Sequence, residues 1–210
     1  MALSRNELRT FYDRFGARQD RQGWYEDEPL AALVAHAGFD EARQVLEVGC
    51  GTGRLAADLL ARHLPSDARY LGLDISQTMV DLSRQRLAPW AGRAEVRLSE
   101  GGFDWPVADR LLSTYMLDLL SETEIDAFIA AARRSLGDGG RLCLVYLAAD
   151  AGPINAAWNW LYRLAPRSVG GCHPVRIVPR LQENGWHLLH RQRISCYGIC
   201  SEVVVAEPGT

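Results

Sequence analysis

The chain has 210 residues, of which 48% are hydrophobic, and a formal net charge of −3. This length can bury one substantial core but is short for two, so we expect a single domain over residues 1–210. The slight acidic excess offers no general field for phosphates, which argues against nucleic acid or an anionic membrane surface as a partner. A compact, neutral small molecule fits better, and the composition predicts no particular oligomeric state.

The first residues, the apolar stretches and the cysteines indicate the cellular compartment. Residues 1–7 lack the apolar run of a secretory signal, and no apolar stretch approaches the about 18 residues of a membrane helix. We therefore expect a cytoplasmic protein without stable membrane insertion. The five cysteines are odd in number and scattered, which predicts reduced thiols. The closest pair, Cys196 and Cys200, lacks a usual zinc spacing, so no metal site is expected.

The first 40 residues predict a helical cap. Apolar residues recur with helical spacing at Leu30, Leu33 and Val34. An aromatic group precedes them, consisting of Phe11, Tyr12, Phe15, Trp24 and Tyr25. We expect residues 1–40 to fold over the rest of the domain as a lid.

Strands and helices alternate through the middle of the chain. The predicted strands are 44–48, 69–73, 94–98, 110–115 and 141–147, and the predicted helices are 54–63, 76–87 and 122–136. The glycine-rich run 137–140 is expected to separate the last helix from its strand. This alternation predicts an α/β, Rossmann-like fold with a mostly parallel sheet and helices on both faces.

The tail departs from this alternation. Two strand-like runs, 186–193 and 199–206, are separated only by a short turn at Tyr197-Gly198, so they should form an antiparallel hairpin. With the five parallel strands the hairpin gives seven strands. Residues 151–179, rich in Gly, Pro and Trp, are expected to form an insertion over the sheet edge, with a helix over 154–164.

A glycine loop follows the first predicted strand. Gly49, Gly51 and Gly53 let the backbone turn sharply and approach a ligand, and the amides of the following helix start face that ligand. Because Gly51-x-Gly53-x-x-Ala56 satisfies the dinucleotide fingerprint, a nicotinamide-dependent oxidoreductase is one interpretation.

Glu47 distinguishes that interpretation from another. This acid lies two residues before the first glycine in an apolar strand, where an unpaired carboxylate is costly and needs a cationic or donor partner. The phosphates of a dinucleotide would repel it, whereas the ammonium group of S-adenosylmethionine would attract it. The acid therefore favours S-adenosylmethionine.

The run from Glu47 to Gly53 resembles the first motif, Glu/Asp-x-Gly-x-Gly-x-Gly, of the class I S-adenosylmethionine-dependent methyltransferases. The resemblance implies that Gly49, Cys50, Gly51 and Gly53 lie against the amino-acid and sugar parts of the cofactor. Cys50 is then a packing residue. The same resemblance implies a seven-stranded methyltransferase sheet.

Two further motifs follow the second and third strands. Asp74 lies about twenty residues past the loop, where a carboxylate can accept from both ribose hydroxyls. The run from Asp74 to Met79 resembles the second family motif, which implies that Ile75 and Met79 sandwich the adenine. Glu100 and Gly101 stand where relatives often have Asp-Ala, and the resemblance implies an acid accepting from the adenine amino group. An exposed loop acid is the alternative for Glu100.

The fourth strand ends near Tyr115 and Asp118, where many relatives contact the cofactor and then carry a His that Asp118 replaces. Methyl transfer is an in-line displacement, to which positioning contributes ~7–11 kcal/mol and a general base roughly 3–5 kcal/mol. A base is therefore optional, and the candidate catalytic residues are His173, Asp118 and Tyr12.

The two irregular segments supply the acceptor pocket. We expect it to be lined by Tyr12, Tyr25, Trp158, Trp160 and His173. With the N-terminal aromatic run, the Trp-rich insertion resembles the ubiquinone, menaquinone and phospholipid-headgroup branches of the family. The leading hypothesis is therefore methyl transfer to oxygen, nitrogen or sulfur of a small, partly hydrophobic metabolite. An oxidoreductase, and a cofactor-binding protein that has lost its chemistry, are the alternatives.

Overall fold

The computed structural model describes residues 4–149 and 171–209. Within them, seven strands form one sheet in the order β3-β2-β1-β4-β5-β7-β6. The strands are β1 (Gln44–Val48), β2 (Arg69–Asp74), β3 (Ala94–Leu98), β4 (Ala108–Thr114), β5 (Leu136–Leu147), β6 (Trp186–Cys196) and β7 (Ile199–Pro208). The first five are parallel, and β7 pairs antiparallel with both β5 and β6. The predicted sheet is confirmed.

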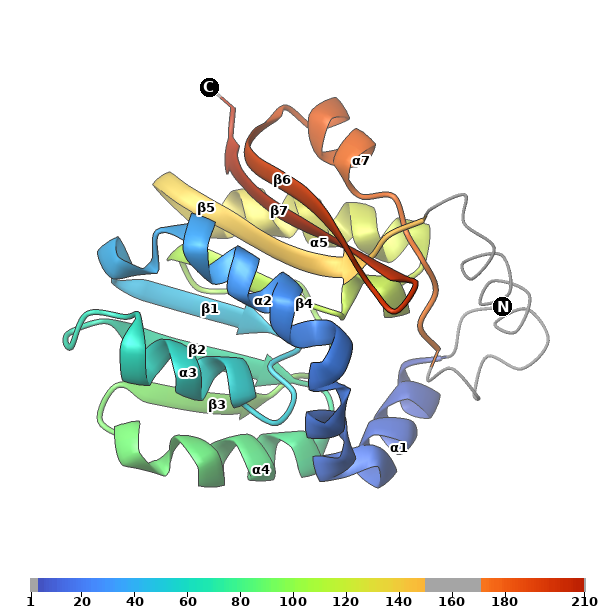
Figure 1. Cartoon of the computed structure of the whole chain (residues 1–210). Helices are drawn as coiled ribbons and strands as arrows, with labels where there is room; N and C mark the ends of the chain where they lie inside the picture. Colours follow the sequence, from blue (N-terminus) through green and yellow to red (C-terminus); the bar gives the residue numbers. More distant parts are fainter. Residues whose placement is uncertain (1–3, 150–170, 210) are drawn as a thin grey trace.

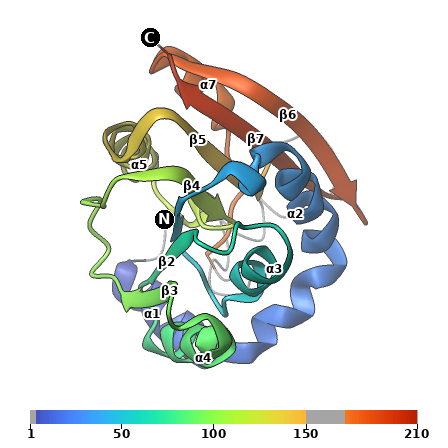
Figure 2. The same ribbon diagram turned by 90° about the vertical axis from the view of Figure 1, so that its left-hand side faces the viewer.

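Helices cover both faces of the sheet (Figures 1 and 2). They are α1 (Arg5–Phe15), α2 (Gly23–Ala37), α3 (Arg54–Arg62), α4 (Gln77–Leu87), α5 (Glu122–Ser135) and α7 (Val178–Glu183). Four 3-10 turns join them within the described residues: η1 (Gly16–Gln22), η2 (Phe39–Glu41), η3 (Ala88–Trp90) and η4 (Leu117–Leu119). The core has two layers, one under α2, α3 and α4 and the other under α5 and α7.

Strand periodicity decides which layer each residue enters. Successive side chains of a strand point to opposite faces, so Leu112 and Cys143 join the layer under α2 while Leu111 and Leu142 join the layer under α5. All four are fully buried. Strands buried on both faces read as continuous apolar runs, which explains why the central strands were visible in the sequence.

The cap helix α1 lies beyond the carboxyl ends of the parallel strands (Figure 1). Arg9 Nε donates to the carbonyl oxygen of Ile75 across 3.0 Å. Asp13 Oδ1 accepts from Ser76 Oγ at 2.6 Å and from Thr78 N at 3.3 Å. These contacts fix α1 across the end of β2 and the start of α4.

The structure corrects two details of the predicted elements. The glycine run 137–140 does not separate helix from strand, because α5 ends at Ser135 and β5 begins at Leu136. The glycines form an irregular start of β5, where the register against β4 shifts and Gly139 has φ +70°. Helix α7 was not predicted at all. Most of the expected insertion, including its helix over 154–164, lies outside the described residues.

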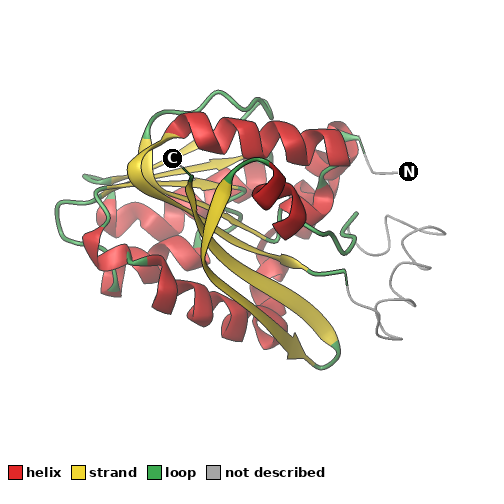
Figure 3. Cartoon of the chain, turned by 90° about the horizontal axis from the view of Figure 1, so that it is seen from above, coloured by secondary structure: helices red, strands yellow, loops and turns green. Residues whose placement is uncertain are grey.

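The C-terminal hairpin forms one edge of the sheet, where β7 pairs with β5 (Figure 3). Glu202 of β7 is buried and accepts from Arg191 and Arg193 of β6, at 2.7 and 2.9 Å, and from the Tyr146 hydroxyl of β5 at 2.5 Å. Burial alone would raise the pKa of Glu202, but these hydrogen bonds lower it. In the part of the chain that is described, no helix is long and apolar enough to cross a membrane.

Candidate functional site

A cavity opens at the carboxyl ends of β1, β2 and β4, the end of the sheet at which α/β proteins bind ligands. The glycine loop and the end of β2 form one wall, and the cap forms another. The lining residues used below are Arg5, Leu8, Tyr12, Gln19, Gly49, Gly51, Asp74, Ile75, Gly101, Phe103, Tyr115, Met116, Leu119, Leu120 and Glu124.

The glycine loop needs its glycines for two reasons. Gly49, Gly51 and Gly53 have φ values of +80°, +53° and +74°, a region that L side chains rarely adopt. A Cβ on Gly49 would lie 2.8 Å from Met116 Cγ, and one on Gly53 would lie 2.4 Å from Ser83 Oγ. The loop therefore takes a shape that both the backbone and the packing restrict to glycine.

Asp74 joins this loop to the end of β2. Its Oδ2 accepts from Gly51 N and its Oδ1 from Ser76 N, each at 2.9 Å. Each carboxylate oxygen keeps a further acceptor position. Because Asp74 also lines the cavity, it is able to accept hydroxyl groups of a ligand there.

Glu47 has a partner that the sequence did not predict. It is 2% exposed, and its Oε2 accepts from the hydroxyl of Tyr70 at 2.6 Å. Burial still raises the pKa of Glu47 to about 7. The inference that Glu47 must meet a ligand cation is weakened, since Tyr70 supplies one donor from within the protein.

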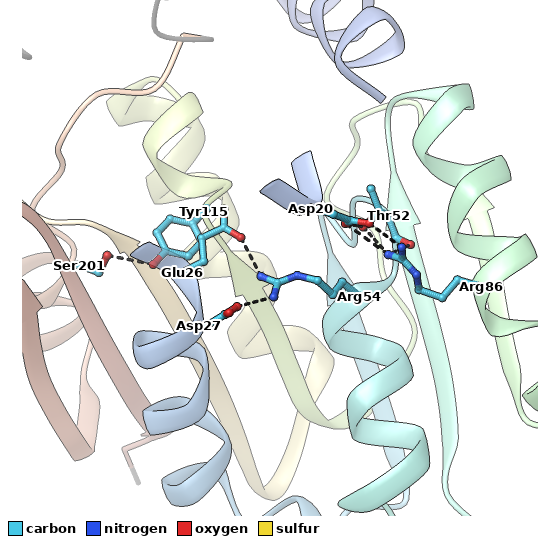
Figure 4. Close-up of polar contacts among 8 residues, drawn as sticks. All are labelled: Asp20, Glu26, Asp27, Thr52, Arg54, Arg86, Tyr115 and Ser201. Carbon is cyan, nitrogen blue, oxygen red and sulfur yellow. Dashed lines mark hydrogen bonds and ion pairs between the residues drawn. The ribbon is translucent and has the colours of Figure 1, made fainter. Parts of the chain in front are cut away.

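A smaller cavity adjoins the first one and is acidic. Glu47 and Cys50 line it together with Glu26, whose pKa burial raises to about 7. Arg54 Nη2 lies 3.1 Å from Glu26 Oε2, so this acid has a cationic partner (Figure 4). The two cavities share Gly49, Gln19, Thr114 and Tyr115.

Gln19, in η1, was missed by the sequence reasoning. Its carboxamide lies directly on the loop, because a Cβ on Gly51 would be 3.0 Å from both Gln19 Nε2 and Gln19 Oε1. Among the described residues, Gln19 Oε1 is buried without a hydrogen-bond partner. No motif marks Gln19, which reaches the loop only through the folding of the cap.

Charged contacts dock η1 on the glycine loop (Figure 4). Asp20 Oδ1 accepts from Thr52 Oγ1 at 2.6 Å, and Arg86 Nη2 lies 2.6 Å from Asp20 Oδ2. Arg86 also donates to the carbonyl oxygen of Thr52 at 2.9 Å. Residues from the cap, the loop and α4 thus meet in one network beside Gln19.

Of the three candidate catalytic residues, Tyr12 lines the larger cavity, whereas Asp118 and His173 line neither cavity. Burial, and after it the neighbouring Cys172 thiol, raise the pKa of Tyr12. Asp118 is 1% exposed, and burial raises its pKa to about 7. His173 N donates to the carbonyl oxygen of Asp118 across 2.9 Å, and burial lowers the pKa of His173. The structure thus brings Tyr12, Asp118 and His173 together.

Tyr115 and Tyr25 stand one behind the other. Tyr115 has φ +52°, lines the cavity, and its hydroxyl lies 2.9 Å from Ser201 Oγ (Figure 4). Tyr25 packs edge-on against the Tyr115 ring at a centroid distance of 5.6 Å and does not itself line the cavity. Trp158 and Trp160, the other expected acceptor contacts, lie outside the described residues.

Three of the expected cofactor contacts line neither cavity. Gly53 is turned toward Ser83, Met79 is 1% exposed inside the core, and Glu100 is exposed to solvent. Ile75 and Gly101 do line the larger cavity, as expected for an adenine site. Some of the motif residues therefore line a cavity and others do not.

Comparison with known proteins supports the same family. Residues 45–140 match the family model described as a methyltransferase domain. The trans-aconitate 2-methyltransferase of Afipia carboxidovorans is 41% identical over 66 residues, 30% of this chain and 25% of that protein. The demethylmenaquinone methyltransferase of Symbiobacterium thermophilum is 29% identical over 116 residues, 53% and 46% of the two chains. This chain therefore aligns with only about a quarter to a half of these relatives.

A solved structure matches almost the whole chain. The complex of DhpI with SAH has a TM-score of 0.68 at 18% identity, and the match covers 98% of this chain and 97% of that one. At this identity the match shows the fold. The domain match runs from β1 to the start of β5, so both comparisons agree that this chain has the fold of a methyltransferase domain.

Proposed function

We propose that this chain binds S-adenosylmethionine in the cavity at the carboxyl ends of β1, β2 and β4 and transfers its methyl group to a small molecule. The observation that carries the proposal is the hydrogen bond of Gly51 N to Asp74. It places a glycine loop, with its amides, and an acid with open acceptor positions on one cavity wall. Asp74 then holds the ribose hydroxyls, and Ile75 and Gly101 border the adenine.

The acidic small cavity fits the amino-acid end of this cofactor. Burial raises the pKa of Glu47 to about 7, so a nearby cation would stabilise its charged form, whereas Glu26, with a pKa also raised to about 7, already pairs with Arg54 in the same lining. Gln19 Oε1 is a further acceptor at the same place. The acceptors of Glu47 and Gln19 in one small cavity suit an ammonium group, which S-adenosylmethionine carries and a pyrophosphate does not.

The chain's own part in the reaction is alignment and exclusion of water. The cofactor supplies a methyl group activated by a sulfonium charge. Leu8 and Tyr12 of α1 cover the cavity, and the contacts of Arg9 and Asp13 with the β2 end fix that cover. Holding the acceptor in line with the methyl group in a dry cavity lowers the barrier by about 7–11 kcal/mol.

The lining supports a partly hydrophobic acceptor. Apolar side chains form much of the cavity lining, and they are Leu8, Phe103, Met116, Leu119 and Leu120. Arg5 is the only cation in the lining that the described residues provide, and it pairs with Glu124 at 3.3 Å. These features, with the net charge of −3, favour a neutral or cationic small molecule over a nucleic acid.

The same charges disfavour the oxidoreductase alternative. A dinucleotide would place its pyrophosphate at the glycine loop, beside the carboxylates of Glu47 and Asp74, where like charges repel. The relatives reported above are methyltransferases. The remaining alternative is a protein that binds the cofactor but does not catalyse methyl transfer, and only a measurement of turnover distinguishes it from an enzyme.

Calorimetry with S-adenosylhomocysteine and with NADH tests the proposal. We expect micromolar affinity for S-adenosylhomocysteine and none for NADH. Absence of S-adenosylhomocysteine binding at millimolar ligand would reject the proposed cofactor. Release of S-adenosylhomocysteine from S-adenosylmethionine with a panel of phenols, amines and thiols then separates an enzyme from a binding protein.

A further inference from the structure

Asp118 is a buried acid whose carboxylate accepts no hydrogen bond from the described residues. It lies in η4, between β4 and α5, and is 1% exposed. Neither carboxylate oxygen has a hydrogen-bond partner within the described residues. Burying a carboxylate in this way costs several kcal/mol, and in folded proteins such groups are ordinarily paired. An acid kept under these conditions needs an explanation, and a ligand is one.

The surroundings of Asp118 contain phenols, a thiol and another acid. Burial raises the pKa of Tyr12 on α1, of Tyr25 on α2 and of Tyr115 after β4, and the charge of Asp118 adds a smaller rise. Burial and then Asp118 likewise raise the pKa of the Cys172 thiol, and Glu26 adds to the rise that burial causes at Asp118. None of these groups is a cation that could neutralise the carboxylate. His173, whose amide binds the Asp118 carbonyl oxygen, is a further titratable neighbour, and burial lowers its pKa.

Asp118 does not itself line the larger cavity, but residues around it do. Tyr12 and Tyr115, both coupled to it, line that cavity. The two residues that follow it, Leu119 and Leu120, line the cavity as well. Its backbone is held by the amide of His173 at 2.9 Å. The acid is therefore fixed in position at the edge of the space where we place the acceptor.

We propose that Asp118 takes the proton of the acceptor, and that the acceptor therefore presents an O–H or N–H group. This proposal rests on the proposed function and specifies its substrate class. In the reaction, the acceptor atom forms its bond to the methyl carbon while the sulfur–methyl bond breaks and its electron pair returns to sulfur. The acceptor's proton passes to the Asp118 carboxylate. The products are the methylated acceptor, S-adenosylhomocysteine and a protonated Asp118.

Sinefungin tests the placement of Asp118 without an identified acceptor. In this analogue a carbon bearing a protonated amine replaces the sulfonium sulfur and its methyl group, whereas S-adenosylhomocysteine carries no charge there. A carboxylate directed at the transferred methyl will bind that amine. We expect Asp118→Asn to weaken sinefungin at least tenfold in calorimetry at pH 7.5 and to change S-adenosylhomocysteine affinity by less than about twofold, as a charge-assisted hydrogen bond predicts.

Glu26→Gln is the matched control, because Glu26 is the other buried acid in this cluster but already has Arg54 as partner. It should affect both ligands alike. Equal loss of both ligands in Asp118→Asn, or no loss of sinefungin, would overturn the proposal for Asp118. If the unaltered protein binds neither ligand, the proposed function fails instead. Thermal unfolding of each variant shows whether the variant has folded.

The rate of methyl transfer gives a second test of the role of Asp118. With a phenol that the unaltered protein methylates, Asp118→Asn should lower kcat about a hundredfold at pH 7 and less at pH 9, where more of the phenol is already ionised. The KM for S-adenosylmethionine should change little. A pH-independent effect would mean that Asp118 supports the fold of the site and does not accept the proton.

Discussion

The backbone amide of Gly51 donates to Oδ2 of Asp74 across 2.9 Å, and this bond connects the glycine loop with the end of the second strand. The loop already has a conformation that only glycine adopts readily at three positions. Asp74 therefore stabilises a preformed ligand surface, and it does so with the same carboxylate that borders the cavity. Binding and loop geometry should be lost together when this acid changes.

Replacing Asp74 with Asn should reduce S-adenosylhomocysteine affinity roughly ten- to a hundredfold. The amide has one acceptor oxygen in place of two, so it cannot serve Gly51, Ser76 and a ribose at once, and a hydrogen bond to a charged group contributes about 1.5–3 kcal/mol. Calorimetry measures the change. Asp81→Asn, on an exposed turn of the neighbouring α4, is the control and should bind like the unaltered protein.

Replacing Glu47 with Gln should weaken S-adenosylmethionine binding roughly tenfold or more, if the acid meets the cofactor ammonium as a charge-assisted hydrogen bond of about 1.5–3 kcal/mol. Tyr70→Phe removes the internal donor and leaves the carboxylate. Comparing the two variants by calorimetry separates the internal partner from the ligand. An unchanged affinity in Glu47→Gln would show that Tyr70 is the only partner of this acid.

Glu47 and Asp74 could be found from the sequence, since the acid before the glycine loop and the acid at the end of β2 are defined by short spacings along the chain. The strands were equally visible, because apolar runs such as that containing Leu111 and Leu112 are local. Gln19 and Tyr70 are different. Each reaches its partner across the fold, Gln19 from the cap to Gly51 and Tyr70 from β2 to Glu47. No local pattern encodes these contacts.

Gln19→Leu should weaken S-adenosylmethionine more than it destabilises the protein. The leucine keeps the bulk that covers Gly51 but removes a buried acceptor that has no partner among the described residues. We expect a three- to tenfold loss of affinity, about 1 kcal/mol for one hydrogen bond, and an unchanged or higher melting temperature. Gln85→Leu, on the exposed side of α4, is the control. A lower melting temperature with unchanged affinity would assign Gln19 to the cap alone.

The acidic acceptor end predicts that trans-aconitate is a poor acceptor for this chain, although proteins named for that substrate are among its relatives. A carboxylate acceptor has no proton to give and would be repelled by Asp118, while Arg5 is already paired with Glu124. Release of S-adenosylhomocysteine with trans-aconitate should be at least tenfold slower than with the best phenol or amine. Comparable rates would contradict the assignment of a protic acceptor.

Asp118 should lower the stability of the protein in a pH-dependent way. Its pKa is raised from 3.8 to about 7 on folding, so the folded state prefers the protonated acid. The resulting loss of stability is absent below pH 4, grows as the pH rises, and is complete above pH 7. A shift of about 3 units corresponds to up to about 4 kcal/mol. Asp118→Asn should therefore unfold like the unaltered protein at pH 4 and at a higher temperature at pH 8. If denaturant unfolding shows no stabilisation at pH 8, the acid has a partner in the folded state, and the reason for assigning it to a ligand disappears.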